Sequence, residues 1–373
     1  MQRKVLLTAM AIASAACCNT VHAQSSVHLY GLIDTTISYT NHADSQGHNL
    51  VQFATPWFSG SRWGLTGAED IGGGTKAIFK LESEFLTSTG EMDTPGVIFN
   101  RDAWIGVQNE TLGKLTFGRQ NALARDVSGI YSDPYTSASL STEETGYTNN
   151  NNFKQLIFYA SSATGTRMDN GAVWKKLWDN GLFAGIGFQF GNVPGSFSTN
   201  TTYTGALGYN GQNFHVSAFY DQAKVNQFTD KSFSIGGNYI FDILRLNAGY
   251  FHYSGEQGAL GQRTDNAYTM SVKVAPRGAF DYELGYQIMH ASNAAYSAST
   301  GATLQGYNPI GLATTTGSGR KNTLYASVFY HFSKRTEVYL AADYMKLYQG
   351  YRVATAPNAN NQFEFAVGMR TRF

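Results

Sequence analysis

Hydrophobic and polar residues alternate along most of this chain with a period of two. Between residues 27 and 39, Leu29, Ile33 and Ile37 fall at one parity, whereas Asp34 and Thr36 fall at the other. Successive side chains of a β-strand point to opposite faces of a sheet, so this pattern predicts strands with one apolar and one polar face. Periodicity alone is equally consistent with a soluble sandwich, whose apolar face would point to a dry core.

Short and long connections also alternate along the chain. The short ones lie at 71–74, 109–113, 210–211, 241–242, 276–278 and 333–335. The long polar ones lie at 41–58, 86–99, 121–152, 191–200, 223–230, 255–265, 291–320 and 348–361. Tight turns at one end and long loops at the other are typical of transmembrane β-barrels. Eight long loops predict an all-β, antiparallel transmembrane barrel of about 16 strands, which is wide enough for an aqueous channel.

In such a barrel the apolar parity faces lipid and the polar parity faces enclosed water. The segment 76–85 gives the clearest prediction. Phe79 and Leu81 should point outward to lipid, while Lys80 and Glu82 point inward to water. Rows of Tyr and Phe near strand ends are expected to form the aromatic girdles at the membrane interfaces.

Two further segments stand out. Residues 161–180 are the least regular part of the chain, and the run from Trp174 to Trp178 fits either a loop turn or an aromatic anchor. The last residues, 363–373, alternate cleanly and end on Phe373, as expected of a closing strand.

The N-terminal segment predicts export. Two basic residues precede a mostly apolar stretch at 5–18, and Val21-His22-Ala23 offers the small residues that a signal peptidase reads. This is the pattern of a secretory signal peptide over 1–23, with the barrel over 24–373. The alternative is a retained membrane anchor, for which the apolar stretch is short and no stop-transfer segment follows.

Composition narrows the classes of function. The chain has 40 Gly, 24 Phe and 23 Tyr but 7 Pro, which suits many strands joined by turns. It carries 27 Lys and Arg against 26 Asp and Glu, and this near-neutral balance gives no reason to expect nucleic-acid binding. Both cysteines, Cys17 and Cys18, lie inside the predicted signal peptide, so the exported chain needs neither a disulfide nor a thiol-bound metal.

Several ordered motifs resemble the general-porin family of Gram-negative bacteria, particularly its proteobacterial members. They are VHLYGLID at 27–34, SRWGLTGAEDIGGG at 61–74, NRDAWIGV at 100–107, LTFGRQ at 115–120 and VGMRTRF at 367–373. The similarity is dense over 24–160, patchy in the middle and clear again at the end. Several motifs in the right order are far more specific than any one of them.

The resemblance implies a homotrimer of 16-stranded barrels, each with its own pore, in which the third outer loop folds into the barrel and narrows it. Here that loop is 121–152. In the family, basic residues on the barrel wall face acids on the inserted loop. Arg62 and Arg101 match two of the wall arginines. The third position reads as Asn152, with Lys154 two residues further on the same face.

The acidic side of the expected constriction is supplied by the loop. Asp126 and Asp133 lie in the part that resembles the family, and Glu143 and Glu144 are further carboxylates. Asp34, on the polar parity of the first strand, is another candidate for the pore lumen. The alternative for each of these charges is an ordinary solvated residue of the lumen or of a loop. Arg119 is a weaker candidate, because it could pair at a subunit interface instead.

We therefore expect an outer-membrane channel, without cofactors, for passive diffusion of small hydrophilic solutes and ions. Lipid and lipopolysaccharide are the expected surroundings, and the terminal Phe373 is the expected tag for the outer-membrane assembly machinery, as the resemblance implies. Charges of opposite sign on facing walls orient water and polar solutes. Arg62, Arg101 and Lys154 favour anions and the loop acids favour cations, so the sequence is consistent with either preference.

Two other classes of function compete with a channel. A barrel enzyme needs a nucleophile or activated water with a positioned base, whereas the histidines here are scattered without a ligand or catalytic spacing. An adhesin or receptor would act through its loops, and 291–320 is long enough, although it contains no binding motif.

Overall fold

The computed structural model describes residues 25–54, 56–143, 159, 161–225, 227–297, 301–302, 315–353, 355–356 and 358–373. Lys154, Glu144 and the predicted signal peptide, 1–23, lie outside these residues. The elements are β1 (Ser26–Thr40), β2 (Leu50–Ala54), β3 (Arg62–Gly72), β4 (Thr75–Glu84), β5 (Asp102–Asn109), β6 (Gly113–Asn121), α2 (Leu123–Ser132), β7 (Arg167–Leu177), β8 (Leu182–Gln189), β9 (Thr202–Asn210), β10 (Phe214–Val225), β11 (Phe228–Phe241), β12 (Leu244–Glu256), the 3-10 turn η2 (Gly258–Leu260), β13 (Gln262–Val274), β14 (Phe280–Ser297), β15 (Gly301–Ala302), β16 (Thr315–His331), β17 (Thr336–Gln349) and β18 (Asn361–Arg372).

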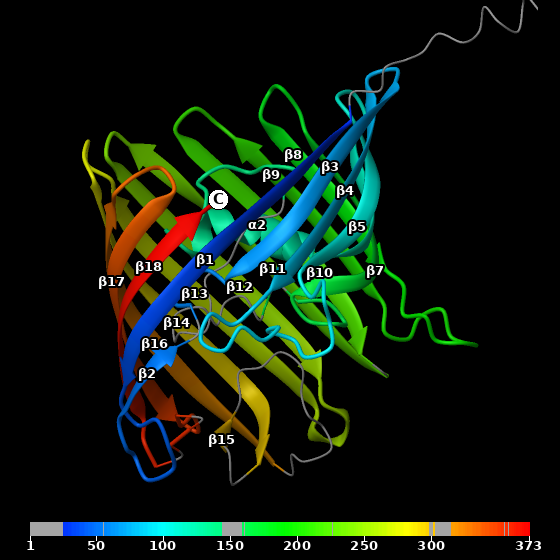
Figure 1. Ribbon diagram of the computed structural model, residues 1–373. Coiled ribbons are helices and arrows are strands. Elements are labelled where there is room, and N and C mark those ends of the chain that lie inside the picture. Colours follow the sequence, from blue (N-terminus) through cyan, green and yellow to red (C-terminus); the bar gives the residue numbers. More distant parts are fainter. Residues whose placement is uncertain are drawn as a thin grey trace, which may run out of the picture.

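The strands form one closed antiparallel barrel (Figure 1). Each long strand pairs with its neighbours in the chain, and β1 pairs with β18 to close the ring. β2 and β3 act as one interrupted strand, because β2 pairs with the second half of β1 and β3 with the first half. With β2 joined to β3 and the two-residue β15 set aside, the barrel has 16 strands. The predicted fold class and strand number are confirmed.

The two faces of the wall differ as predicted. On β13, Met270 is 62% exposed on the outside, whereas its neighbour Thr269 is 1% exposed and faces inward. On β4, Phe79 is aligned with Ile105 of β5, which is 64% exposed on the outer face. Glu82, at the opposite parity, is buried inside the barrel. Apolar side chains therefore clothe the surface that faces lipid, and polar ones line the lumen.

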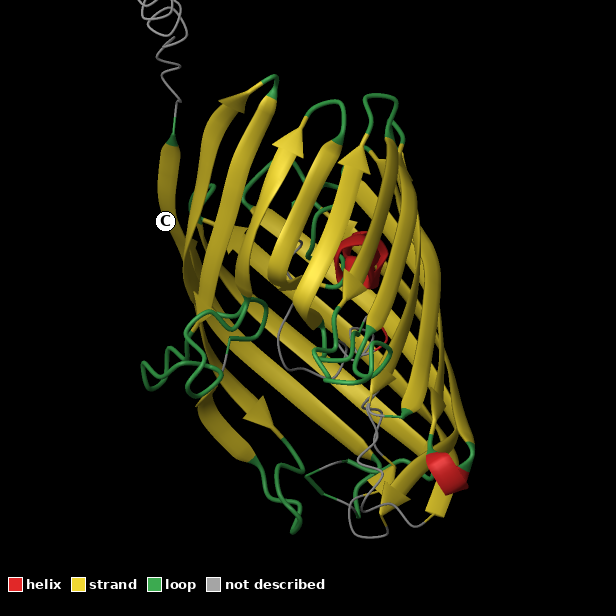
Figure 2. Ribbon diagram, turned by 90° about the vertical axis from the view of Figure 1, so that its right-hand side faces the viewer, coloured by secondary structure: helices red, strands yellow, loops and turns green. Residues whose placement is uncertain are grey.

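Short turns gather at one end of the barrel and longer loops at the other (Figure 2). The turn between β3 and β4 illustrates the short class, because Gly72, Gly73 and Gly74 have φ angles of +90°, +63° and +71°. Side chains with a Cβ rarely adopt these angles, so three consecutive glycines suit this turn. One predicted long segment, 223–230, is shorter than expected, since β10 ends at Val225 and β11 begins at Phe228.

The irregular segment 161–180 contains a strand, β7. Its alternation is broken because the pairing of β6 with β7 shifts register between Gly118 and Gln120, opposite the start of β7. Asn170 has a positive φ of 52° at the same place. A bulge of this kind moves the inward and outward parities out of phase. A simple period-two reading of the sequence therefore fails here.

The third loop enters the barrel as predicted. It begins with α2, where Leu123, Val127 and Ile130 recur at helical spacing and form an apolar stripe. Every residue of α2 is buried, and the helix packs against β8 to β13 (Figure 2). Among the described residues, no helix is long and apolar enough to cross a bilayer.

Placing a charge on the lipid-facing surface tests this assignment of faces. Ile235 lies in the middle of β11 and is 59% exposed on the outside. Ile235→Arg should lower the free energy of unfolding by about 2–4 kcal/mol, the cost of Arg at the bilayer midplane. Phe241→Arg, on the same face at the end of the same strand, should cost only about 0–1 kcal/mol. Urea titrations of both variants in lipid vesicles measure the difference, and equal costs would contradict the assignment.

Candidate pore constriction

Three arginines lie at the start of strands that follow a long loop. Arg62 begins β3, Arg101 immediately precedes β5, and Arg167 begins β7. These three strands run in the same direction, so their first residues lie at a similar height on the wall. Arg101 is close enough to both Arg62 and Arg167 for their positive charges to repel one another. The barrel thus gathers a row of guanidinium groups, called here the arginine row.

Acids beside the arginine row neutralise part of it. Arg101 forms ion pairs with Glu82 and Glu84 of β4. Lys80 Nζ lies 2.9 Å from Asp102 Oδ2, and the Tyr30 hydroxyl donates to Glu82 over 2.7 Å. The network holds Arg101 against the wall, because two carboxylates pair with its guanidinium and Glu82 is itself fixed by Lys80 and Tyr30.

Arg62 and Arg167 are different. Neither has an acidic oxygen within 4.0 Å in the part of the chain that the structure describes, and both are partly exposed. Their charges are therefore less compensated than that of Arg101. Two partly exposed guanidinium groups beside a paired one leave this stretch of wall electropositive.

The predicted loop acids face other partners. Asp126 of α2 forms a buried ion pair with Lys175 of β7 and accepts a hydrogen bond of 2.8 Å from Asn121 Nδ2. Asp133 follows α2, where its carboxylate accepts the backbone N–H of Tyr135 over 2.9 Å. Neither forms an ion pair with Arg62 or Arg101. The structure brings Arg62 and Arg101 together, but it does not bring these two acids to them.

Asp34 is fully buried and holds a second inserted segment. Between β2 and β3 the chain leaves the wall, and Trp57 and Phe58 turn into the barrel. Asp34 accepts the backbone N–H of Ser59 over 2.9 Å and the Tyr339 hydroxyl over 2.7 Å. Its carboxylate thus fixes this segment to the wall.

Aromatic rings join this second inserted segment to the third loop. Phe58 stacks on Tyr135 at 4.7 Å between ring centroids, and Tyr135 stacks on Phe329 of β16 at 5.4 Å. Phe58 also meets Tyr339 of β17 edge to face at 4.8 Å. The aromatic cluster of Phe58, Tyr135, Phe329 and Tyr339 therefore ties the far part of the third loop to the wall opposite β8 to β10. The loop spans the lumen because it is held on both sides.

Arg245 of β12 is the main polar anchor of the same loop. Its guanidinium donates to the backbone oxygens of Ile130, Thr136 and Ser137 at 2.8, 2.6 and 3.3 Å, and to that of Pro134 at 3.4 Å. Backbone oxygens at the end of α2 lack helical partners, so one planar donor group satisfies several of them at once.

Further bonds hold α2 itself. Ser217 Oγ donates to the Val127 oxygen over 2.8 Å, and the Tyr131 hydroxyl meets Ser234 Oγ at 2.6 Å. Burial raises the pKa of the Tyr131 hydroxyl, so it stays a neutral partner for Ser234. These hydrogen bonds therefore fix the inserted loop to the inner wall of the barrel.

A family model described as Gram-negative porin matches residues 7–348 of this chain. The chain belongs to the Gram-negative porin family. An outer membrane porin protein of Bordetella pertussis is 29% identical over 380 residues, which cover 92% of this chain and 94% of the relative. Outer membrane porin protein 32 of Delftia acidovorans is 37% identical over 110 residues, which cover 30% of each chain.

Solved structures share the fold of this porin. An anion-selective porin from Comamonas acidovorans superposes with a TM-score of 0.73 at 21% identity, over 94% of this chain and 100% of that one. The OmpT outer membrane protein of Vibrio cholerae, in a trimer form, gives 0.65 at 15% identity, over 94% and 99%. The protein is an outer-membrane porin that forms a channel, as the sequence predicted.

Arg167 is the residue that sequence reasoning missed in this porin. Asn152 and Lys154 were expected at the third position of the basic cluster, and both lie outside the described residues. The signal for Arg167 was its place at the start of the strand that follows the third loop, as Arg62 and Arg101 stand after their own connections. The broken alternation of β7 hid that strand.

Arg119 lies on the outer wall of the porin. Its register partner is Ala103, at the parity that faces outward, and its guanidinium pairs with Asp169. This position places it outside the lumen.

Proposed function

We propose that the arginine row, Arg62, Arg101 and Arg167, forms the constriction of this porin and gives it a preference for anions. The observation that carries the proposal is that Arg62 and Arg167 have no ion pair among the described residues, while Asp126 of the inserted loop is paired with Lys175 instead. An electropositive stretch in a narrow wet passage attracts anions and repels cations.

Passage through the channel is passive diffusion of small hydrophilic solutes and ions. A solute that enters a narrow pore must keep its hydration or replace it, and the guanidinium donors of the arginine row replace water around an anion. No energy source is needed, since each solute moves down its own gradient. Lys154 and Asp133 belong to the proposed lining as well, the former from outside the described residues.

We infer that the functional unit of this porin is a homotrimer. β3 to β9 span 8–11 residues, whereas β10 to β14 and β16 to β18 span 12–18, so one side of the barrel has a shorter wall. A side that is too short for the bilayer is well suited to contact another subunit instead. The V. cholerae relative in fold is described in a trimer form. Light scattering of the purified porin in detergent measures the mass directly.

Export, assembly and the absence of catalysis complete the proposed function. The signal peptide over 1–23 directs export, Phe373 is read by the assembly machinery, and lipopolysaccharide surrounds the mature barrel. His331, a histidine whose ring contacts two acids, has both ring nitrogens engaged by carboxylates, Asp281 and Glu337, which speaks against a catalytic base at this position. Such a ring has no nitrogen left to activate a nucleophile.

The proposal is tested by electrical recording. Purified protein in planar bilayers under a KCl gradient should give conductance steps, with a reversal potential of the sign set by chloride. A reversal potential set by potassium would reject the anion preference. The absence of conductance steps, together with hydrolysis of lipid or peptide that is lost on one His or Ser substitution, would reject the channel in favour of an enzyme.

A further inference from the structure

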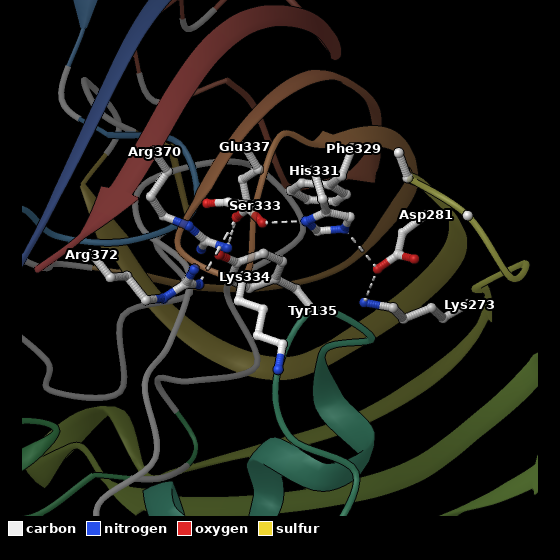
Figure 3. A pocket seen from close by; sticks show the side chains of 12 residues that line it. Tyr135, Lys273, Asp281, Phe329, His331, Ser333, Lys334, Glu337, Arg370 and Arg372 are labelled. Atoms are coloured by element: carbon white, nitrogen blue, oxygen red, sulfur yellow. Dashed lines mark hydrogen bonds and ion pairs between the residues drawn. The ribbon is translucent and has the colours of Figure 1, made fainter.

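A polar hollow of about 680 Å³ opens at the short-turn end of the barrel (Figure 3). Its walls come from the ends of β13 and β14, the turn between β16 and β17, and the end of β18, while Tyr135 of the third loop closes it from inside. Five of its lining residues carry basic side chains and two carry acidic ones: Lys273, His331, Lys334, Arg370 and Arg372 against Asp281 and Glu337.

Both acids of the lining are already occupied. Glu337 contacts His331 Nδ1 at 2.8 Å, the Arg370 guanidinium, and Arg372 Nη2 at 3.9 Å. Asp281 contacts His331 Nε2 at 3.2 Å and Lys273 Nζ at 3.0 Å. Figure 3 shows both carboxylates turned toward these basic groups rather than toward open space. Glu283, which does not line the hollow, also pairs with Lys273, with its Oε1 3.4 Å from Lys273 Nζ.

Donors are left over after these pairs are made. Lys334 is exposed and has no ion pair within the described ranges, and the Arg372 side chain is 41% exposed with one distant contact. Arg370 Nε and the Tyr135 hydroxyl are buried without a hydrogen-bond partner among the described residues. A buried donor without an acceptor costs about 1–3 kcal/mol, so an acceptor that reached it would be held.

We propose that this hollow is a binding subsite for a small oxyanion, either a carboxylate or a phosphate. The Arg372 guanidinium and the Lys334 ammonium supply the charge, and a guanidinium fork matches the paired oxygens of either group. The hollow lies within the range of about 300–1,000 Å³ that is usual for small-molecule sites. It lies beyond the tip of the third loop, so it would hold an anion between the constriction and the short-turn mouth.

The subsite rests on the porin being a conducting channel and deepens the proposed function by naming a solute class. It does not rest on the arginine row, because none of those three residues lines the hollow. A solute bound at the mouth obstructs the flow of other ions. Occupancy can therefore be measured as a partial block of the current carried by chloride.

The experiment titrates inorganic phosphate, and separately acetate, against the chloride current at constant chloride concentration. We expect a saturable block by at least one of the two, and the stronger blocker shows whether the site takes phosphate or carboxylate. In Lys334→Gln/Arg372→Gln the half-blocking concentration should rise about fivefold or more, because two charged donors are lost. Lys334→Gln/Arg372→Lys, which keeps the charge at position 372, should have a half-blocking concentration between those of the wild type and the double glutamine variant.

Arg335→Gln is the matched control. Arg335 lies in the same turn and is exposed, but it does not line the hollow. It should leave the half-blocking concentration within about twofold, since an exposed charge that does not line the hollow is screened by salt. Absence of block by both oxyanions, an unchanged double variant, or an equal shift in Arg335→Gln would overturn the subsite. Failure of the channel itself is distinguishable, because then no chloride current is measured at all.

Discussion

Arg101→Ala should shift the reversal potential of this porin further toward cation preference than removal of any other single charge. Arg101 pairs with Glu82 and Glu84, so its loss removes a positive charge and also leaves the negative charge of these two carboxylates less compensated. One unit charge at about 4 Å acts on an ion with about 1 kcal/mol even in water, which is about a fivefold change in the ratio of permeabilities. Planar-bilayer recordings under a KCl gradient measure this shift.

Arg62→Ala should move the reversal potential in the same direction by a smaller amount, because no carboxylate is released with it. Arg277→Ala is the control, since that side chain is 91% exposed in a turn outside the pore. It should leave the reversal potential unchanged. If both Arg62→Ala and Arg101→Ala also leave it unchanged, these residues do not lie in the constriction.

Arg245→Ala should loosen the third loop and raise both the single-channel conductance and the open-channel noise. The substitution removes a guanidinium that donates to four backbone oxygens of the loop. Hydrogen bonds to a charged group contribute about 1.5–3 kcal/mol each, so the docking of the loop would be strongly weakened. The barrel strands keep their own backbone pairing, so the barrel should still fold.

Arg320→Ala provides the matched control for that experiment. Arg320 stacks on Tyr348, with its guanidinium 4.4 Å from the ring centroid, on the outer wall and away from the loop. Its removal should leave conductance and noise unchanged. Equal noise in wild type and Arg245→Ala would show that the aromatic cluster of Phe58, Tyr135, Phe329 and Tyr339 and the bonds to β10 and β11 fix the loop without Arg245.

The wall of the barrel was predictable because its physics is local. Whether Phe79 points to lipid or to water follows from its parity relative to Lys80, and a glycine run such as 72–74 specifies a turn without reference to the rest of the chain. The strand number and the inserted loop were predicted and are confirmed. β7 was not assigned, because a bulge opposite its first residues shifts the alternation.

The interior was less predictable because its contacts join residues far apart in sequence. Asp126 was expected to face the arginines, but the fold brings Lys175 to it, 49 positions away. Asp34 was expected in the lumen, and it is buried under the second inserted segment by bonds to Ser59 and Tyr339. Which basic group meets which acid depends on the height of each strand in the barrel, and that height is set by register rather than by composition.

Substituted cysteines on one strand test the central claim most directly, namely that polar side chains surround enclosed water while apolar ones face lipid. Protein prepared from residue 24 onward contains no cysteine of its own. Ser271 faces inward on β13 and its neighbour Met270 faces outward. A charged, water-soluble thiol reagent should reduce the current through Ser271→Cys and leave Met270→Cys unaffected. Reduction of the current in Met270→Cys, with none in Ser271→Cys, would contradict the account.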